Sequence, residues 1–165
     1  MMSGAARLTF FCGKMAAGKS TLARELAVGE DAVLLVQDEF LGRLFPGEIL
    51  DVADFFRCSA RLRDALAPHI CELLAKGVSV VLDFPGNTVQ QRAWFRELFE
   101  RAGVDHELHV IEVSDALCKH QLRLRSRDLP PGTPWTTDAE FDAITAYFQP
   151  PSEDERFTIV RHVRE

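Results

Sequence analysis

Lysine is scarce in this chain of 165 residues, which has it only at positions 14, 19, 76 and 119. None of the four lies in the [Asn/Thr]-Lys-x-Asp pattern that reads guanine in GTPases, so the sequence excludes a GTPase of that type. Basic residues are also outnumbered: 19 Lys and Arg stand against 25 Asp and Glu, which gives a net charge of −6. Since a long nucleic acid is bound by a basic surface, nucleic acid is not expected as a partner.

Cysteine occurs four times, at Cys12, Cys58, Cys71 and Cys118, and never in a C-x-x-C pair or at zinc-finger spacing from a histidine. This excludes a zinc site of the usual structural kind. We expect reduced, mostly buried thiols in a cytoplasmic protein. No apolar run approaches the roughly 20 residues of a membrane span, so no membrane association is expected. The short run at 8–12 leads straight into a glycine-rich loop, which favours a strand over a signal peptide.

Apolar runs alternate with amphipathic stretches along the whole chain. This alternation predicts an α/β fold in which right-handed crossovers build a parallel sheet, within one domain over 1–165. The fourth strand, which alternates apolar and polar residues, is expected to be the more exposed one. The expected strands are 7–12, 32–36, 78–82, 107–113 and 157–160, and the expected helices are 20–28, 51–76, 88–101, 114–126 and 138–148. Thr88 and Gln91 form a capping-box signature.

The glycine-rich loop fits the pattern G-x-x-x-x-G-K-[ST] and lies between an expected strand and an expected helix. Glycines let backbone N–H groups surround phosphate oxygens, and the helix N-terminus adds positive potential. Lys19 supplies a charge to the β- and γ-phosphates, and the Ser20 hydroxyl is a ligand for Mg²⁺. The loop therefore predicts a nucleoside triphosphate site. Its expected contact residues are Gly13, Lys14, Met15, Ala16, Ala17, Gly18, Lys19, Ser20 and Thr21.

Two carboxylates follow expected strands and so lie at the sheet edge where ligands bind. Asp38, after the second strand, is a candidate base for a substrate hydroxyl, or alternatively the N-cap of a helical segment at 39–44. Asp83, at the end of the third strand, is a candidate for the Mg²⁺ coordination shell, or alternatively a cap for the turn at Pro85.

A cluster of arginines precedes a loop that is rich in proline, at about 128–137. Arg123 and Arg127 share one helix face, while Arg125 points elsewhere. Together with the loop they are interpreted as a lid over about 123–137, in which Arg123 or Arg127 stabilises charge on the transferring phosphate. The alternative is a solvated helix face. His106, His109 and His162 are interpreted as structural or surface residues.

The chain resembles the small P-loop kinases of the AAA-type "predicted kinase" group. The resemblance rests on the glycine-rich loop, the segments around Asp38 and Asp83, the arginines at 123–127 and the tail Phe148-Gln149-Pro150-Pro151. Those proteins are similar in fold to nucleoside monophosphate kinases, gluconate kinase, polynucleotide kinase and the zeta toxins. The resemblance implies a three-layer α/β/α P-loop NTPase fold, with a five-stranded parallel sheet of the nucleoside-monophosphate-kinase type and a lid. It also implies ATP and Mg²⁺ as cofactors, Asp38 as the residue that activates the acceptor, and Pro150-Pro151 near the adenine. The sequence departs from several of these kinases in lacking an arginine two or three residues after Asp38; Arg43 comes later.

The expected activity is transfer of the γ-phosphate of ATP to a hydroxyl of a small molecule or nucleotide, with Lys19, Asp38, Arg123 and Arg127 as catalytic residues and Ser20 and Asp83 at the metal. Two alternatives stay open. One is a kinase of nucleic-acid 5′ ends, which the acidic balance disfavours. The other is a nucleotide-binding switch or an ATPase without a phosphoryl acceptor. The acceptor and the oligomeric state do not follow from the sequence.

Overall fold

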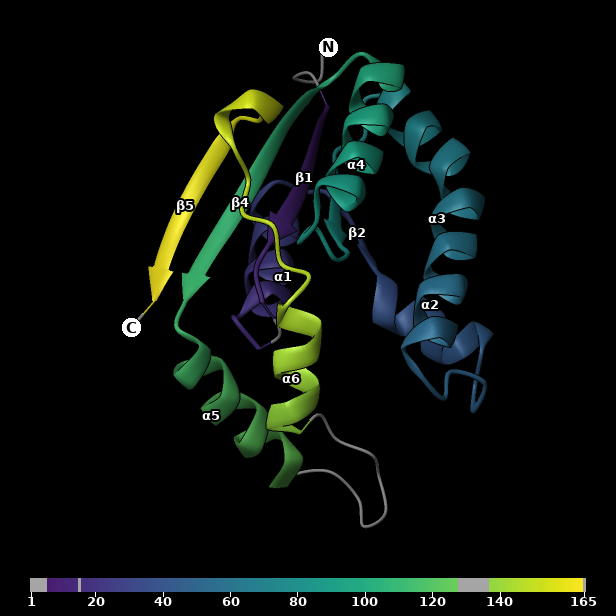
Figure 1. The fold of residues 1–165 in the computed structure, drawn as a ribbon. Coiled ribbons are helices and arrows are strands. Elements are labelled where there is room, and N and C mark those ends of the chain that lie inside the picture. The colour runs from purple at the N-terminus through teal and green to yellow at the C-terminus, as the bar shows by residue number, and fades with distance from the viewer. Residues whose placement is uncertain (1–5, 15, 128–136, 165) are drawn as a thin grey trace.

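A computed structural model describes residues 6–14, 16–127 and 137–164, with the side chains of 126 and 127 left out. Its centre is a parallel sheet of five strands in the order β2-β3-β1-β4-β5, so that the first strand is the middle one (Figure 1). The strands are β1 (Arg7–Cys12), β2 (Val33–Val36), β3 (Val80–Asp83), β4 (Asp105–Val113) and β5 (Ile159–Arg164). All five were predicted, and the parallel arrangement is confirmed.

Helices cover both faces of the sheet because the strand residues alternate between two apolar cores. Leu8 and Phe10 of β1 belong to the larger core, whereas Phe11 belongs to the smaller one. On the larger core pack α2 (Gln37–Leu44), α3 (Val52–Ala75) and α4 (Val89–Ala102). On the smaller one pack α1 (Lys19–Gly29), α5 (Asp115–Arg127) and α6 (Asp138–Thr145), and a short 3₁₀ turn, η1 (Glu153–Glu155), precedes β5. The three-layer α/β/α architecture is therefore confirmed.

Side-chain caps fix where several helices begin. The predicted capping box of α4 is present, with Thr88 accepting a hydrogen bond from the backbone N–H of Gln91. Asp51 caps α3, and Thr137 forms a second capping box with Glu140 at the start of α6. These short polar residues bind N–H groups that the first helical turn leaves without a partner.

The fourth strand corrects one expectation from the sequence. β4 lies inside the sheet, between β1 and β5, and its residues Leu108, His109, Val110 and Ile111 are buried. The predicted exposure was wrong because β4 lies inside the sheet, where its side chains pack into the apolar cores on both faces. β5 itself runs to Arg164, beyond the predicted end at 160, because an edge strand tolerates exposed polar residues. Helix boundaries shift by smaller amounts: α1 includes Lys19 and Gly29, and α6 ends at Thr145.

The strands place the candidate site residues at one edge of the sheet. β1 leads into the glycine-rich loop, and β3, its neighbour, ends at Asp83. Val36 at the end of β2 pairs with Asp83, so α2 begins beside the end of β3. Of the predicted lid at 123–137, residues 128–136 lie outside the described residues. Among the described helices, none combines the length and the apolar character needed to span a membrane.

Candidate active site

The glycine-rich loop connects β1 to α1 as the sequence predicts. Ala16 and Gly18 have positive φ angles of 62° and 100°, and the N–H of Ala17 donates a hydrogen bond to the carbonyl of Lys14. Gly18 is the N-cap of α1 and provides no side chain to cap it. The first N–H groups of α1 are therefore available to an anion, which the positive end of the helix also favours. Met15, another expected contact residue, lies outside the described residues.

Ser20 and Lys19 both meet Asp83 at the end of β3. The Ser20 hydroxyl donates a hydrogen bond of 2.7 Å to Asp83 Oδ2, and Lys19 Nζ lies 3.7 Å from Asp83 Oδ1. The Asp83 side chain is 5% exposed. Its carboxylate thus faces the loop, and among the described residues it accepts no hydrogen bond from the turn at Pro85, contrary to the capping alternative. A hydroxyl and a carboxylate oxygen at this separation fit Mg²⁺, which prefers hard oxygen ligands.

Asn87, four residues after the end of β3, anchors the entrance of the loop. The backbone N–H of Gly13 donates a hydrogen bond of 2.9 Å to Asn87 Oδ1. Asn87 is itself held from two sides: its N–H donates to Gln91 Oε1 at 2.9 Å, and its carbonyl accepts the N–H of Gln149 at 2.8 Å. From this segment the sequence predicted only the capping box at Thr88; the structure also gives Asn87 a contact with the loop.

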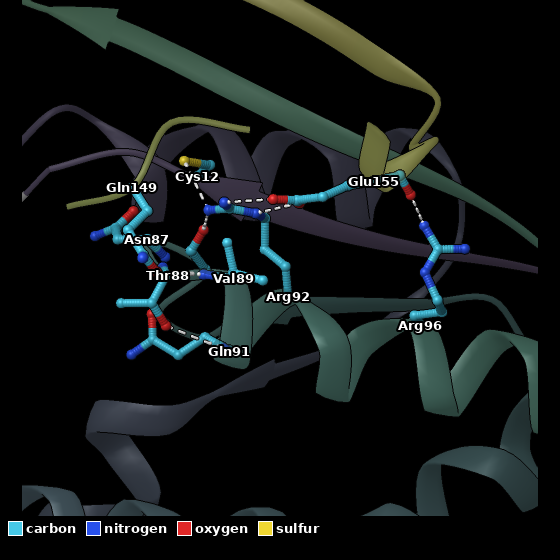
Figure 2. A network of polar contacts seen from close by, with 10 residues as sticks. Cys12, Asn87, Thr88, Val89, Gln91, Arg92, Arg96, Gln149 and Glu155 are labelled. Atoms are coloured by element: carbon cyan, nitrogen blue, oxygen red, sulfur yellow. Dashed lines mark hydrogen bonds and ion pairs between the residues drawn. The ribbon is translucent and has the colours of Figure 1, made fainter. Parts of the chain in front are cut away.

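Next to Gly86 and Asn87 lies an ion pair that was not predicted from the sequence. Arg92 of α4 is fully buried, and its Nε and Nη2 donate to the two carboxylate oxygens of Glu155 at 2.7 and 2.9 Å (Figure 2). Its Nη1 donates to the carbonyl of Gly86 at 2.9 Å. Burial raises the pKa of the neighbouring Cys12 thiol to about 11, so this thiol is neutral near pH 7 although Arg92 acts in the opposite direction. The sequence does contain one indication that Arg92 is buried. Arg92 shares a helix face with Phe95 and Phe99, and a charged residue is unusual on such an apolar face.

Asp38 lies in the first turn of α2, next to the sheet edge. α2 begins at Gln37, and its N-cap is Val36, which makes no side-chain hydrogen bond. The alternative that Asp38 caps a helix at 39–44 is therefore wrong. Asp38 is exposed, and within the described part of the chain its carboxylate has no hydrogen bond or ion pair. Val36, at the end of β2, pairs with Asp83 at the end of β3. Asp38 comes just after Val36, so it lies at the same sheet edge, on the side of Asp83 away from β1.

The cations of α5 contact α6. Arg123 Nη2 lies 2.6 Å from Asp138 Oδ2, and Lys119 Nζ lies 2.9 Å from Asp142 Oδ1. The Arg127 side chain is outside the described residues, so the proposed catalytic roles of Arg123 and Arg127 stay predictions.

Lys14 connects the loop with the start of α5 and with the segment after α6. Its Nζ lies 2.6 Å from Asp115 Oδ1 and 5.3 Å from the centre of the Phe148 ring. Asp115 starts α5, and Phe148 follows α6. Lys14 thus makes contacts within the protein, and its expected contact with nucleotide stays a prediction.

Comparisons with known proteins agree with this architecture. Residues 8–151 match the model of the AAA_33 family, described as an AAA domain. Similar solved structures include a protein from Chloroflexus aurantiacus J-10-fl (TM-score 0.75, 18% identity, 96% of this chain and 88% of that chain) and a sugar kinase from Janibacter sp. HTCC2649 (0.66, 16%, 96% and 85%). A third is the APS kinase CysC of Mycobacterium tuberculosis in complex with AMPPNP and APS (0.61, 20%, 98% and 91%). No curated protein matches the sequence. At these identities the structures share the P-loop NTPase fold.

Proposed function

Because the chain belongs to the AAA_33 family of AAA domains, we propose that it is an ATP-dependent kinase whose acceptor is a hydroxyl group of a small molecule or nucleotide. The observation that supports this most directly is the meeting of Lys19, Ser20 and Asp83 at the start of α1. A phosphate-binding loop, a lysine and a pair of oxygen ligands for magnesium are the parts that phosphoryl transfer needs in this class of enzyme.

In this proposal the loop holds the triphosphate, and Lys19 contacts its β- and γ-phosphates. Ser20 and Asp83 hold Mg²⁺, which neutralises charge on the phosphates when it is bound. Lys19 is 22% exposed on its side chain and lies within 4 Å of Asp83, so its ammonium is already directed toward the metal side of the loop. Catalysis then consists mainly of positioning and charge neutralisation.

Asp38 is the proposed base for the acceptor hydroxyl. It follows β2, the strand beyond β3, so the order along the sheet edge is Asp38, then Asp83, then the loop. An exposed carboxylate without a protein partner can accept a proton from an incoming hydroxyl. Arg123 and Arg127 are proposed to reach the transferring phosphate, which would require Arg123 to leave Asp138.

The acceptor is expected to be small, since the net charge of −6 disfavours a long nucleic acid. The similar structures include a sugar kinase and an APS kinase, which makes sugars and nucleotides sensible first compounds for a screen. All four cysteines are free and buried, which is consistent with the proposed cytoplasmic location.

The test is ADP release from ATP and Mg²⁺ across a library of sugars, nucleosides and nucleotides. We expect one class of hydroxyl compound to raise ADP release in the wild type and in Lys76→Ala, an exposed control. Lys19→Ala should lose ATP binding, because a charge-assisted contact is removed. Asp38→Asn should keep ATP affinity but lose turnover, since an amide does not accept the proton. Equal ADP release with and without every compound would favour an ATPase instead, and unchanged turnover in Asp38→Asn would exclude its role as base.

A further inference from the structure

The last described residue of β5 reaches the phosphate-binding loop. A Cβ atom placed on Gly18 would lie 2.8 Å from Cζ and 3.3 Å from Nη2 of Arg164, and nearest to its Nη1. The guanidinium group therefore rests against Gly18. Since β5 is separated from β1 by β4, the side chain of Arg164 extends past the end of β4 to make this contact. Figure 1 shows the ends of β4 and β5 side by side, close to where α1 begins.

Within the described part of the chain, no acidic side chain balances the charge of Arg164. Lys14 and Lys19, the two lysines of the loop, lie 2.6 and 3.7 Å from Asp115 and Asp83. The guanidinium of Arg164, in contrast, makes no ion pair or hydrogen bond with any residue that the structure describes, although its backbone belongs to the sheet. It also lies beside the N-terminus of α1, whose positive end disfavours a cation. A bound anion would be attracted both to the guanidinium and to the positive end of α1, and would so offset the repulsion between them.

We propose that Arg164 binds the phosphates of the nucleotide, in addition to Lys19 and the loop. The proposal rests on the proposed function, because it takes the loop to be a nucleotide site. A guanidinium offers planar pairs of N–H donors that suit phosphate oxygens. Its position on Gly18, the residue before Lys19, places these donors next to the N–H groups that hold phosphate. No sequence pattern indicated this residue, since it is far from the loop along the chain.

Arg161 provides a matched control on the same strand. It carries the same charge, lies three residues earlier, and pairs with Glu112 at 2.7 Å. Residues an odd number of positions apart on a strand point to opposite faces, so Arg161 and Arg164 do not share a surface.

The experiment measures the Kd of ATP with Mg²⁺ by calorimetry, for the wild type, Arg164→Ala, Arg164→Lys, Arg161→Ala and Lys19→Ala, at low and at high NaCl concentration. We expect Arg164→Ala to raise the Kd about tenfold at low salt, with a smaller ratio at high salt because salt screens the lost attraction. Arg164→Lys should recover part of the affinity, and Arg161→Ala should bind as the wild type does. Thermal unfolding of each variant verifies that it is folded.

Two results would overturn the proposal. One is a Kd for Arg164→Ala equal to that of the wild type at low salt. The other is the same loss at every salt concentration without recovery in Arg164→Lys, which would assign Arg164 only to packing against Gly18. If Lys19→Ala weakens binding while Arg164→Ala binds ATP as tightly as the wild type does, the nucleotide site stands and only the role of Arg164 fails. If the wild type itself binds no ATP, the proposed function fails together with it. Binding is measured without an acceptor, so neither the test of Arg164 nor the test of the nucleotide site depends on turnover.

Discussion

The Ser20 hydroxyl donates a hydrogen bond of 2.7 Å to Asp83 Oδ2, which joins the first turn of α1 to the end of β3. Neighbouring oxygen ligands of an octahedral Mg²⁺ lie about 3 Å apart, because each is about 2.1 Å from the ion. The two side chains therefore have the separation expected of adjacent ligands. Little rearrangement would be needed for magnesium to bind both oxygens in place of this hydrogen bond, with the Ser20 hydroxyl keeping its proton and turning it away from the ion.

Asp83→Asn tests this arrangement. The amide is similar in size and can still accept the Ser20 hydrogen bond, but it carries no charge for the metal. We expect the affinity for ATP in the presence of Mg²⁺ to fall by about 10-fold or more. Without Mg²⁺ the affinity should be unchanged or higher, because a negative charge near the phosphates has been removed. Calorimetry with and without Mg²⁺ measures both; Asp64→Asn, an exposed change on α3, is the control. An equal loss in both conditions would argue against a metal role.

The buried pair of Arg92 and Glu155 should be a major contribution to stability. Removing Arg92 leaves the Glu155 carboxylate, whose side chain is only 14% exposed, without its partner, and breaking a buried pair in this way typically costs about 3–5 kcal/mol. We expect Arg92→Ala to lower the free energy of unfolding by about this amount, measured by urea denaturation. Arg161→Ala, which breaks the exposed pair with Glu112, should change it by about 1 kcal/mol or less. Similar effects of the two substitutions would show that Arg92 contributes no more than a surface residue.

How far the sequence predicts the site depends on how local each signal is. The phosphate loop, Ser20 and the strand-end carboxylate Asp83 were predictable, because a residue type and its place after a strand are visible in a few neighbouring positions. The contacts of Asn87 with Gly13 and of Arg92 with Glu155 join residues 74 and 63 positions apart. Only the strand order brings these residues together, and local sequence patterns do not reveal that order. The burial of β4 was missed for the same reason, since it depends on the place of β4 inside the sheet.

His109 gives stability a dependence on pH. Burial lowers the pKa of this histidine, although a hydrogen bond with Glu107 acts in the opposite direction, and His162 lies 2.9 Å from its Nδ1. The folded state thus keeps His109 neutral, while the unfolded chain binds a proton near pH 6.5. Its contribution is fully present above that pH and is lost as pH falls below it.

The variant His109→Gln removes the titrating group but keeps hydrogen-bonding capacity. We expect its free energy of unfolding to fall less than that of the wild type between about pH 6.5 and 5. His69→Gln, at an exposed position on α3, should retain the wild-type slope. Urea denaturation at several pH values measures the slopes, and identical slopes for the wild type and His109→Gln would contradict the assignment.

Asn87, the only asparagine of the chain, should control how firmly the phosphate loop is held. Its carboxamide oxygen accepts the N–H of Gly13, and its own backbone is fixed by Gln91 and Gln149. In Asn87→Ala the Gly13 N–H loses its acceptor, so part of the binding energy of a nucleotide must order the loop. A neutral hydrogen bond contributes about 0.5–1.5 kcal/mol, which corresponds to a roughly 2- to 12-fold weaker affinity for ATP.

Asn87→Asp separates the hydrogen bond from the charge. The aspartate still accepts from Gly13, but it places a negative charge beside the proposed phosphate site. Its loss of ATP affinity should therefore diminish at high salt, whereas the loss in Asn87→Ala should not, because no charge is involved. Gln90→Ala, which changes an exposed amide in the first turn of α4, is the control and should bind as the wild type does. Calorimetry at two salt concentrations decides between these outcomes. Wild-type affinity in Asn87→Ala would mean that Gly13 is held firmly by the rest of the loop, and that the contact with Asn87 has no part in nucleotide binding.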